Sequence, residues 1–179
     1  ANYGTLVYAI LFLIVFVETG LIVMPLLPGD SLLFAAGAIA AANGNEGLNI
    51  WILMPLLILA ALCGDNVNYF VGKFFSEQIK KRERILFFKR DYITQTEEFY
   101  AKYGRQAIIM ARFVPFVRTF APFAAGVARM KYRTFVIYDL LGGALWVGSM
   151  LLAGYLLGEV TWIREHVDLM AIGIILISV

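Results

Sequence analysis

The feature that most constrains this chain is a series of apolar blocks, each close to the length of a membrane-spanning segment. The blocks cover residues 3–17, 21–42, 48–63, 106–128 and 135–157, and a further apolar run begins at residue 169. A helix needs about 20 apolar residues to cross the hydrocarbon core of a bilayer. With 61% hydrophobic and 16% charged residues, the chain is too apolar for one water-soluble core. We therefore expect an all-α integral membrane protein with several transmembrane helices, in a single membrane domain that covers residues 1–179.

Charge is distributed unevenly along the chain. Residues 1–72 contain no Lys or Arg, whereas residues 73–105 hold most of the 15 basic residues, mixed with acids. Basic connections between transmembrane segments favour the cytoplasmic side. We expect residues 73–105 to form a cytoplasmic, basic, amphipathic connection with solvated charges, between one half at about 3–72 and another at about 106–179. The net charge of only +2 argues against a nucleic-acid partner.

Two of the apolar blocks are poor simple spans. The block at 21–42 contains two prolines and an aspartate, and the block at 106–128 contains two arginines and two prolines. Proline removes a backbone donor and breaks a helix, and a charge at membrane depth costs roughly 2.5–3.5 kcal/mol. Broken backbone at that depth is tolerated only where protein buries it or where it lines a wet cavity. Each block therefore predicts a re-entrant helix hairpin.

The two broken blocks also share a tetrapeptide. Phe34-Ala35-Ala36-Gly37 recurs 89 residues later as Phe123-Ala124-Ala125-Gly126, each time after a short turn with proline and charge. Chance recurrence in an Ala-rich and Phe-rich chain is the alternative. Paired, interrupted apolar segments in two halves are the pattern of transporter binding sites. We expect the two hairpins to be related as an inverted repeat.

Two arginines are the most informative charged residues. Arg112 and Arg118 lie between two apolar stretches, with Thr119 following the second. A guanidinium stays charged and binds phosphate oxygens in a two-pronged geometry, and a broken helix adds free amides that favour anions. We predict a phosphate head-group site at Arg112, Arg118, Thr119 and Ser31. The alternative is that the arginines are structural and neutralise a buried acid.

Two acids are the candidate partners of these arginines. Glu18 ends the first apolar block, and is either an interfacial residue or a residue inside the protein that pairs with a buried cation or carries a proton. Asp30 follows Pro28-Gly29 and is either a helix N-cap or a titratable group at the hairpin tip. A carboxylate in an apolar site takes up a proton more easily unless a cation is near. Glu18 and Asp30 are therefore the predicted proton-coupling residues.

Further polar residues lie at block ends. Asp65 and Asn68 close the third block, and they either line the same cavity or form the polar end of a helix. Asp139 is expected at the membrane interface. Trp146 is expected to be a packing or interfacial belt residue.

Several long motifs, in order, carry a family resemblance. They are Glu18-Thr19-Gly20, Leu27-Pro28-Gly29-Asp30-Ser31-Leu32-Leu33, Gly64-Asp65-Asn66-Val67-Asn68-Tyr69 and the segment 111–123, which begins Ala111-Arg112-Phe113. Together they resemble the DedA family of bacterial inner-membrane proteins, which is related to eukaryotic VTT-domain lipid scramblases. The resemblance implies two facing re-entrant hairpins in a multi-pass protein of the inner membrane. It also implies movement of lipid carriers, either undecaprenyl phosphate or phospholipids, that depends on the proton gradient, and it puts the functional groups at Glu18, Asp30, Arg112 and Arg118.

These features lead to a flippase that binds an anionic lipid head group and exchanges protons. The second hypothesis, a membrane enzyme, is disfavoured because the single histidine, His166, lies far along the sequence from the hairpins. With one Cys and one His no zinc site is expected, and neither metal nor cofactor is predicted. The third hypothesis is a proton or ion transporter without a lipid substrate. Homo-oligomerisation stays open, and the absence of an initial methionine suggests trimmed ends.

Overall fold

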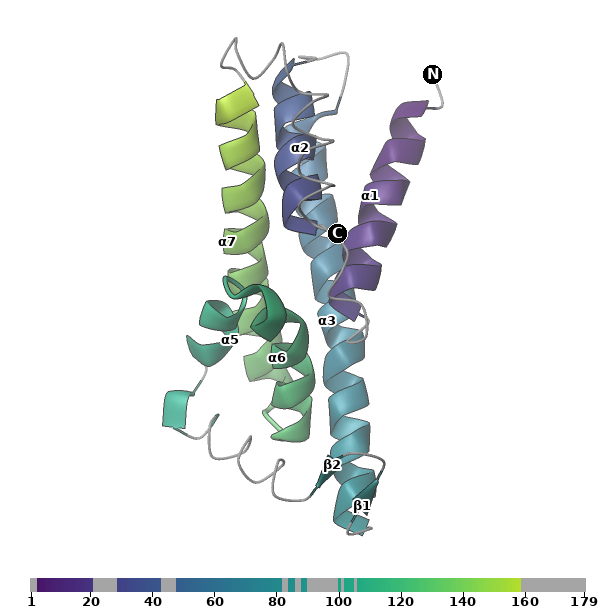
Figure 1. The fold of residues 1–179 in the computed structure, drawn as a ribbon, viewed down its shortest axis with the longest axis vertical. Coiled ribbons are helices and arrows are strands. Elements are labelled where there is room, and N and C mark those ends of the chain that lie inside the picture. Colours follow the sequence, from purple (N-terminus) through teal and green to yellow (C-terminus); the bar gives the residue numbers. More distant parts are fainter. Residues whose placement is uncertain are drawn as a thin grey trace. The chain divides into compact units, whose positions relative to one another are not determined.

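The computed structural model (Figure 1) describes residues 3–20, 29–42, 48–81, 84–85, 88–89, 100, 102–104 and 106–158. Several predictions fall outside these ranges. The proline turn in block 21–42, most of the connection after residue 81, His166 and the final apolar run belong to this group. They stay predictions.

The described part of the chain is mostly helical. Its elements are α1 (Tyr3–Gly20), α2 (Gly29–Ala42), α3 (Ile50–Lys81), β1 (Arg84–Ile85), β2 (Phe88–Lys89), α5 (Gln106–Ala111), α6 (Pro115–Val127) and α7 (Tyr132–Gly158). The two-residue strands pair antiparallel, with Arg84 opposite Lys89. Helical secondary structure agrees with the fold class that the apolar blocks predict.

Two helices are long and apolar enough to span a membrane. They are Ile50–Ser76 within α3 and Tyr132–Leu157 within α7, with mean hydropathies of 1.9 and 1.8. Large apolar side chains such as Trp51, Phe74 and Leu145 are exposed on them, which suits contact with lipid chains. α3 continues to Lys81, so the start of the predicted connection 73–105 extends this helix.

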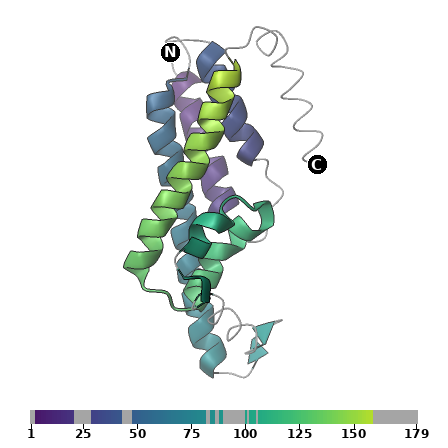
Figure 2. The same cartoon turned by 90° about the vertical axis from the view of Figure 1, so that its left-hand side faces the viewer.

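The second broken block forms two short helices, as Figures 1 and 2 both show. α5 ends at Ala111, and α6 begins at Pro115. Val114 between them is extended, with φ −111° and ψ 112°, because the ring of a following proline disfavours the helical conformation. Proline at the first position of α6 loses no hydrogen bond, since that amide has no partner within a helix. The helix break therefore falls inside the block where the prolines predict it.

The described chain divides into two compact units. Unit 1 contains residues 1–15, 26–60 and 144–179, and unit 2 contains residues 16–25 and 61–143. Each unit thus takes segments from both halves of the sequence. The units are described separately below.

In unit 2, α6 packs closely on α3 through glycine. A Cβ added at Gly126 would lie 2.0 Å from the carbonyl oxygen of Tyr69, and one at Gly72 would lie 2.1 Å from that of Phe123. Each helix therefore presents a glycine to a backbone carbonyl of the other. Small residues of this kind let helix backbones approach closely in membranes.

In unit 1, α2 packs on α7 in the same manner. A Cβ at Gly37 would lie 2.2 Å from the carbonyl oxygen of Leu151, and one at Gly154 would lie 2.0 Å from that of Phe34. Both copies of the repeated tetrapeptide thus make a reciprocal glycine contact with a long helix encoded in the other half of the sequence. The inverted arrangement of the halves stays a prediction.

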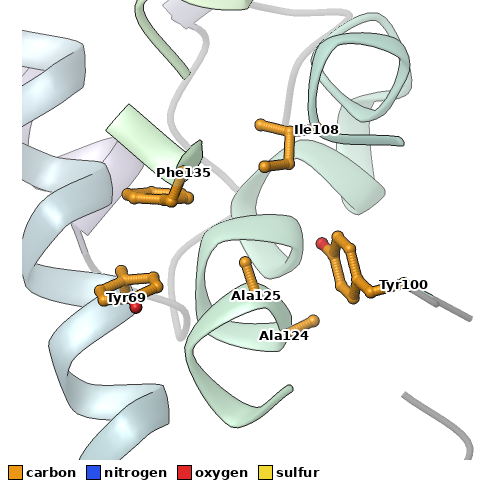
Figure 3. Close-up of a cluster of buried hydrophobic side chains, with 6 residues drawn as sticks. All are labelled: Tyr69, Tyr100, Ile108, Ala124, Ala125 and Phe135. Atoms are coloured by element: carbon orange, nitrogen blue, oxygen red, sulfur yellow. The ribbon is translucent and has the colours of Figure 1, made fainter. Parts of the chain in front are cut away.

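An apolar cluster holds the helices of unit 2 together (Figure 3). Tyr69 of α3 stacks on Phe135 of α7 with ring centroids 4.5 Å apart, and its hydroxyl donates to the carbonyl of Met130. The Tyr100 hydroxyl donates to the carbonyl of Ala121 on α6 over 2.8 Å. The cluster also contains Ile108, Ala124 and Ala125. It fixes the packing beside the polar residues of this unit.

Candidate functional site

A buried ion pair joins the end of α1 to the start of α6 in unit 2. The guanidinium of Arg118 donates to the carboxylate of Glu18, with 2.6 Å between the Nη2 and Oε1 atoms. The side chains are 11% and 2% exposed, respectively. A charge of each sign in so buried a place is tolerated because the two neutralise one another. Glu18 is therefore the buried partner of a cation, as one of the two alternatives expects.

Close backbone contact positions Glu18. Gly64 of α3 lies against the last turn of α1, where an added Cβ would be 2.0 Å from Oγ1 of Thr19 and 2.8 Å from the amide nitrogen of Gly20. The Thr19 hydroxyl lies 3.4 Å from the carbonyl oxygen of Ala61. The motif Glu18-Thr19-Gly20 thus meets Gly64-Asp65 because glycines leave no side chain between the helices.

Asn68 links the backbones next to both members of the ion pair. Its side-chain amide donates to the carbonyl of Thr19 and lies 3.4 Å from the carbonyl oxygen of Thr119. Asn68 is buried, as is usual only for an amide with partners. It therefore positions Glu18 and Arg118 through the residues that follow them.

The second arginine lies between two other acids. Nη2 of Arg112 donates to the carboxylates of both Asp65 on α3 and Asp139 on α7. The three side chains are 4%, 2% and 0% exposed. Among the residues that the structure describes, these are the acids that bind Arg112, whereas the sequence alternative named Glu18 or Asp30.

Two glycines on α7 lie next to the side chain of Arg112. Gly142 and Gly143 follow Asp139 by three and four residues, so they lie on the same helix face. A Cβ at Gly142 would lie 3.2 Å from Cγ of Arg112, and one at Gly143 would lie 3.8 Å from its guanidinium carbon. The Arg112 side chain therefore lies along α7 on its way to Asp139.

Asp30 belongs to unit 1, near the start of α2. Its Oδ1 accepts a hydrogen bond of 2.7 Å from the indole nitrogen of Trp146. Trp146 is buried, and a buried indole N–H needs an acceptor. Trp146 is therefore a packing residue with a polar partner. Ser31, beside Asp30, is partly buried.

The structure thus divides the predicted site residues into three groups. It pairs Glu18 with Arg118, places Arg112 with Asp65, and links Asp30 to Trp146. Thr119, which follows Arg118 in the chain, is buried, and so is Asn68, which lies close to the backbone of Thr119. Asp65 and Asn68 do not form a solvated polar end of a helix, because α3 continues well past them.

The sequence reasoning missed the role of Asp139. Asp139 was expected only to lie at the membrane interface, whereas its side chain is fully buried in the protein and bonded to Arg112. The signal that could have revealed it is Asp139-Leu140-Leu141-Gly142-Gly143, an acid followed by two glycines inside an apolar helix. Among the described residues there is no group of three or more His, Cys, Asp or Glu that could hold a metal ion.

The two apolar helices of spanning length, α3 and α7, are consistent with a helical membrane protein. The VTT domain family matches residues 27–156. Over 179 residues the chain is 48% identical to Protein DedA of Escherichia coli K12, covering 100% of this chain and 81% of that protein. The chain belongs to the DedA family, as its motifs indicated.

Two more relatives of this chain are also named as membrane proteins. The chain is 42% identical over 165 residues to an uncharacterized membrane protein of Mycobacterium leprae, covering 92% of this chain and 72% of the relative. It is 32% identical over 163 residues to the inner membrane protein YqjA of Escherichia coli K12, covering 91% and 73%. No solved structure matches this chain.

Proposed function

We propose that this protein is a flippase that moves anionic lipids across the bacterial inner membrane and binds their phosphate head groups at Arg118. The substrate is undecaprenyl phosphate or a phospholipid. The observation that carries the proposal is the Glu18–Arg118 ion pair, which is 2.6 Å long. An ion pair of this kind presents a phosphate-binding group that a carboxylate occupies until the ligand arrives.

The chemistry of Arg118 supports phosphate as the ligand. A guanidinium offers a planar fork of donors that matches two phosphate oxygens, whereas a lysine ammonium acts as a point charge. Arg118 retains 11% exposure of its side chain against 4% for Arg112. Arg118 is thus the more accessible of the two arginines.

The start of α6 adds a second attraction for an anion. Its N-cap is Val114, which makes no side-chain capping hydrogen bond, and its first residue is a proline. The first turn of a helix leaves amides without intrahelical partners, and the helix dipole favours a negative charge there. Arg118 lies in that first turn, with its amide bonded to the carbonyl of Val114 over 3.0 Å.

Exchange of partners would couple lipid binding to protons. When phosphate occupies Arg118, the Glu18 carboxylate loses the cation that offsets its burial. A buried carboxylate without a cation favours its protonated form, so Glu18 would take up a proton as lipid binds. Release of that proton would restore the ion pair and help to expel the head group.

A translocation assay in reconstituted vesicles tests the proposal. Purified protein is inserted into vesicles that contain a fluorescent polyprenyl phosphate, and arrival of the head group at the opposite leaflet is followed with time. We expect Arg118→Lys to lose at least about tenfold in rate although the charge is kept, which corresponds to about 1.4 kcal/mol. The matched control is Lys102→Arg, an exposed basic residue. Wild-type rates in Arg118→Lys would contradict the proposal.

The same assay separates the other two hypotheses. An enzyme would release inorganic phosphate from the lipid, which a colorimetric assay of the same vesicles detects. An ion transporter would carry protons at an equal rate with and without polyprenyl phosphate. The flippase proposal expects lipid movement without phosphate release, and a proton flux that depends on lipid.

A further inference from the structure

Two buried acids share a single arginine in unit 2. Asp65 and Asp139 come from different helices, and both accept from the same nitrogen, Nη2 of Arg112. With both acids ionised, the cluster carries one net negative charge. Burying an uncompensated charge costs roughly several kcal/mol even after the protein relaxes. The state with both acids ionised is therefore unfavourable.

Within the residues that the structure describes, one oxygen of the cluster makes no hydrogen bond. Oδ2 of Asp139 is buried and makes no hydrogen bond within the described part of the chain. A buried polar atom without a partner is rare in native proteins and calls for an explanation such as an ion or a functional role. A protonated carboxyl group differs from a carboxylate in gaining one O–H donor. A bound proton removes the excess charge of this cluster.

We propose that Asp65, Arg112 and Asp139 form a proton-binding site that holds one exchangeable proton on the acid pair. The proton comes from a hydronium ion: its O–H bond breaks, water leaves, and an O–H bond to a carboxylate oxygen forms. With the proton bound, the cluster is neutral; after release it is negative by one charge. The pair shares the proton, as close carboxylates generally do.

The surroundings of the pair explain why one proton suffices. Asp65 faces Arg112, Asp139 and, more weakly, Arg118, and Arg118 is already balanced by Glu18. Asp139 faces Arg112 and Tyr100. Burial, with a smaller contribution from Asp139, raises the pKa of the Tyr100 hydroxyl, so this neighbour stays neutral. Arg112 is the cation that offsets one of the two acids.

The site is distinct from the Glu18–Arg118 pair but is linked to it through α3. Asp65 and Asn68 are three residues apart on this helix, and Asn68 bonds the backbone beside Glu18. Loss of the proton would change the charge next to α3 and thereby the environment of Arg118. This inference does not require that lipid be transported, because proton binding can be measured on the protein alone.

Infrared difference spectroscopy of the protein in detergent micelles without phospholipid tests the inference, because no phosphate is then present to displace Glu18 from Arg118. Spectra at acidic and alkaline pH are subtracted, and the carbonyl band of a protonated carboxyl group is followed. We expect a band in the wild type that is lost in Asp139→Asn and in Asp65→Asn, because each substitution leaves a neutral pair of one acid and Arg112. Potentiometric titration should show one proton fewer per protein in either variant.

Isotope labelling gives a result that does not depend on variants folding. The band should shift when the wild type contains ¹³C-labelled aspartate and should stay in place with ¹³C-labelled glutamate. The inference is overturned if the band shifts with labelled glutamate or persists in Asp139→Asn.

Discussion

The carboxylate of Glu18 accepts a 2.6 Å hydrogen bond from the guanidinium of Arg118, which lies 100 residues further along the chain. The pair joins the last turn of α1 to the first turn of α6 within one compact unit. Because the groups are 2% and 11% exposed, each is costly to leave alone. The ion pair therefore stabilises the structure, and a phosphate that binds Arg118 has to break it.

A thermodynamic cycle measures the first of these roles. We expect Glu18→Gln and Arg118→Gln each to lower the free energy of unfolding by roughly 3–5 kcal/mol, the cost typical of removing one partner from a buried ion pair. The double variant should lose less than the sum of the two. Unfolding in mixed micelles with increasing denaturant gives the values. Additive losses would show that the two groups do not interact.

The glycine contacts predict that two Gly→Ala substitutions differ strongly in their effect on stability. Gly126→Ala would place a Cβ 2.0 Å from the carbonyl oxygen of Tyr69, so α6 has to move away from α3. We expect a loss of stability of about 1–3 kcal/mol or more. Gly148→Ala on α7 is the matched control, because an added Cβ meets nothing within 4 Å. Thermal unfolding should show no loss for this control. Equal losses in both variants would refute the close contact.

The link through Asn68 predicts a change in function that exceeds the change in stability. Asn68→Ala removes the donor to the carbonyls of Thr19 and Thr119, which costs roughly 1–3 kcal/mol for buried groups left unpaired. Because these carbonyls adjoin Glu18 and Arg118, lipid translocation should fall even at temperatures where the variant is fully folded. Unchanged translocation by the folded variant would assign Asn68 a purely structural role.

Some of this fold follows directly from the sequence. The apolar blocks predict α3 and α7, and the prolines of block 106–128 predict the break between α5 and α6, because these are local effects of side-chain hydrophobicity and of the proline ring. The repeated tetrapeptide marks two glycines, Gly37 and Gly126. Their partners, Gly154 and Gly72, could not be predicted, because nothing local specifies which helix a small residue will meet.

In the candidate site, too, the sequence indicates which residues need partners but not which partners they have. That Arg112 and Arg118 need buried acids follows from their position in an apolar block. Which acid each one binds depends on how α1, α3 and α7 pack, and the sequence offered Glu18 and Asp30 for both arginines. The partner of Asp139 was missed because an acid that follows the basic residues 129–133 resembles an interfacial residue. Gly142 and Gly143, on the same helix, lie next to the side chain of Arg112.

The contact between Trp146 and Asp30 yields a prediction for unit 1. Trp146→Phe keeps an aromatic ring but removes the N–H that donates to Asp30 over 2.7 Å. We expect a loss of about 1.5–3 kcal/mol, as for a hydrogen bond to a charged group. The loss from Trp146→Phe should shrink when Asp30 is already replaced by Asn. An undiminished loss in that background would show that the hydrogen bond contributes little.

In the proposed mechanism phosphate competes with Glu18 for Arg118, and equilibrium binding of a short-chain polyprenyl phosphate to the purified protein measures this competition. At neutral pH, Glu18→Gln removes the competing carboxylate, so we expect this variant to bind the lipid more tightly than the wild type. Arg118→Lys should bind it at least about tenfold more weakly. Weaker binding by Glu18→Gln, or unchanged binding by Arg118→Lys, would show that phosphate and Glu18 do not compete for Arg118.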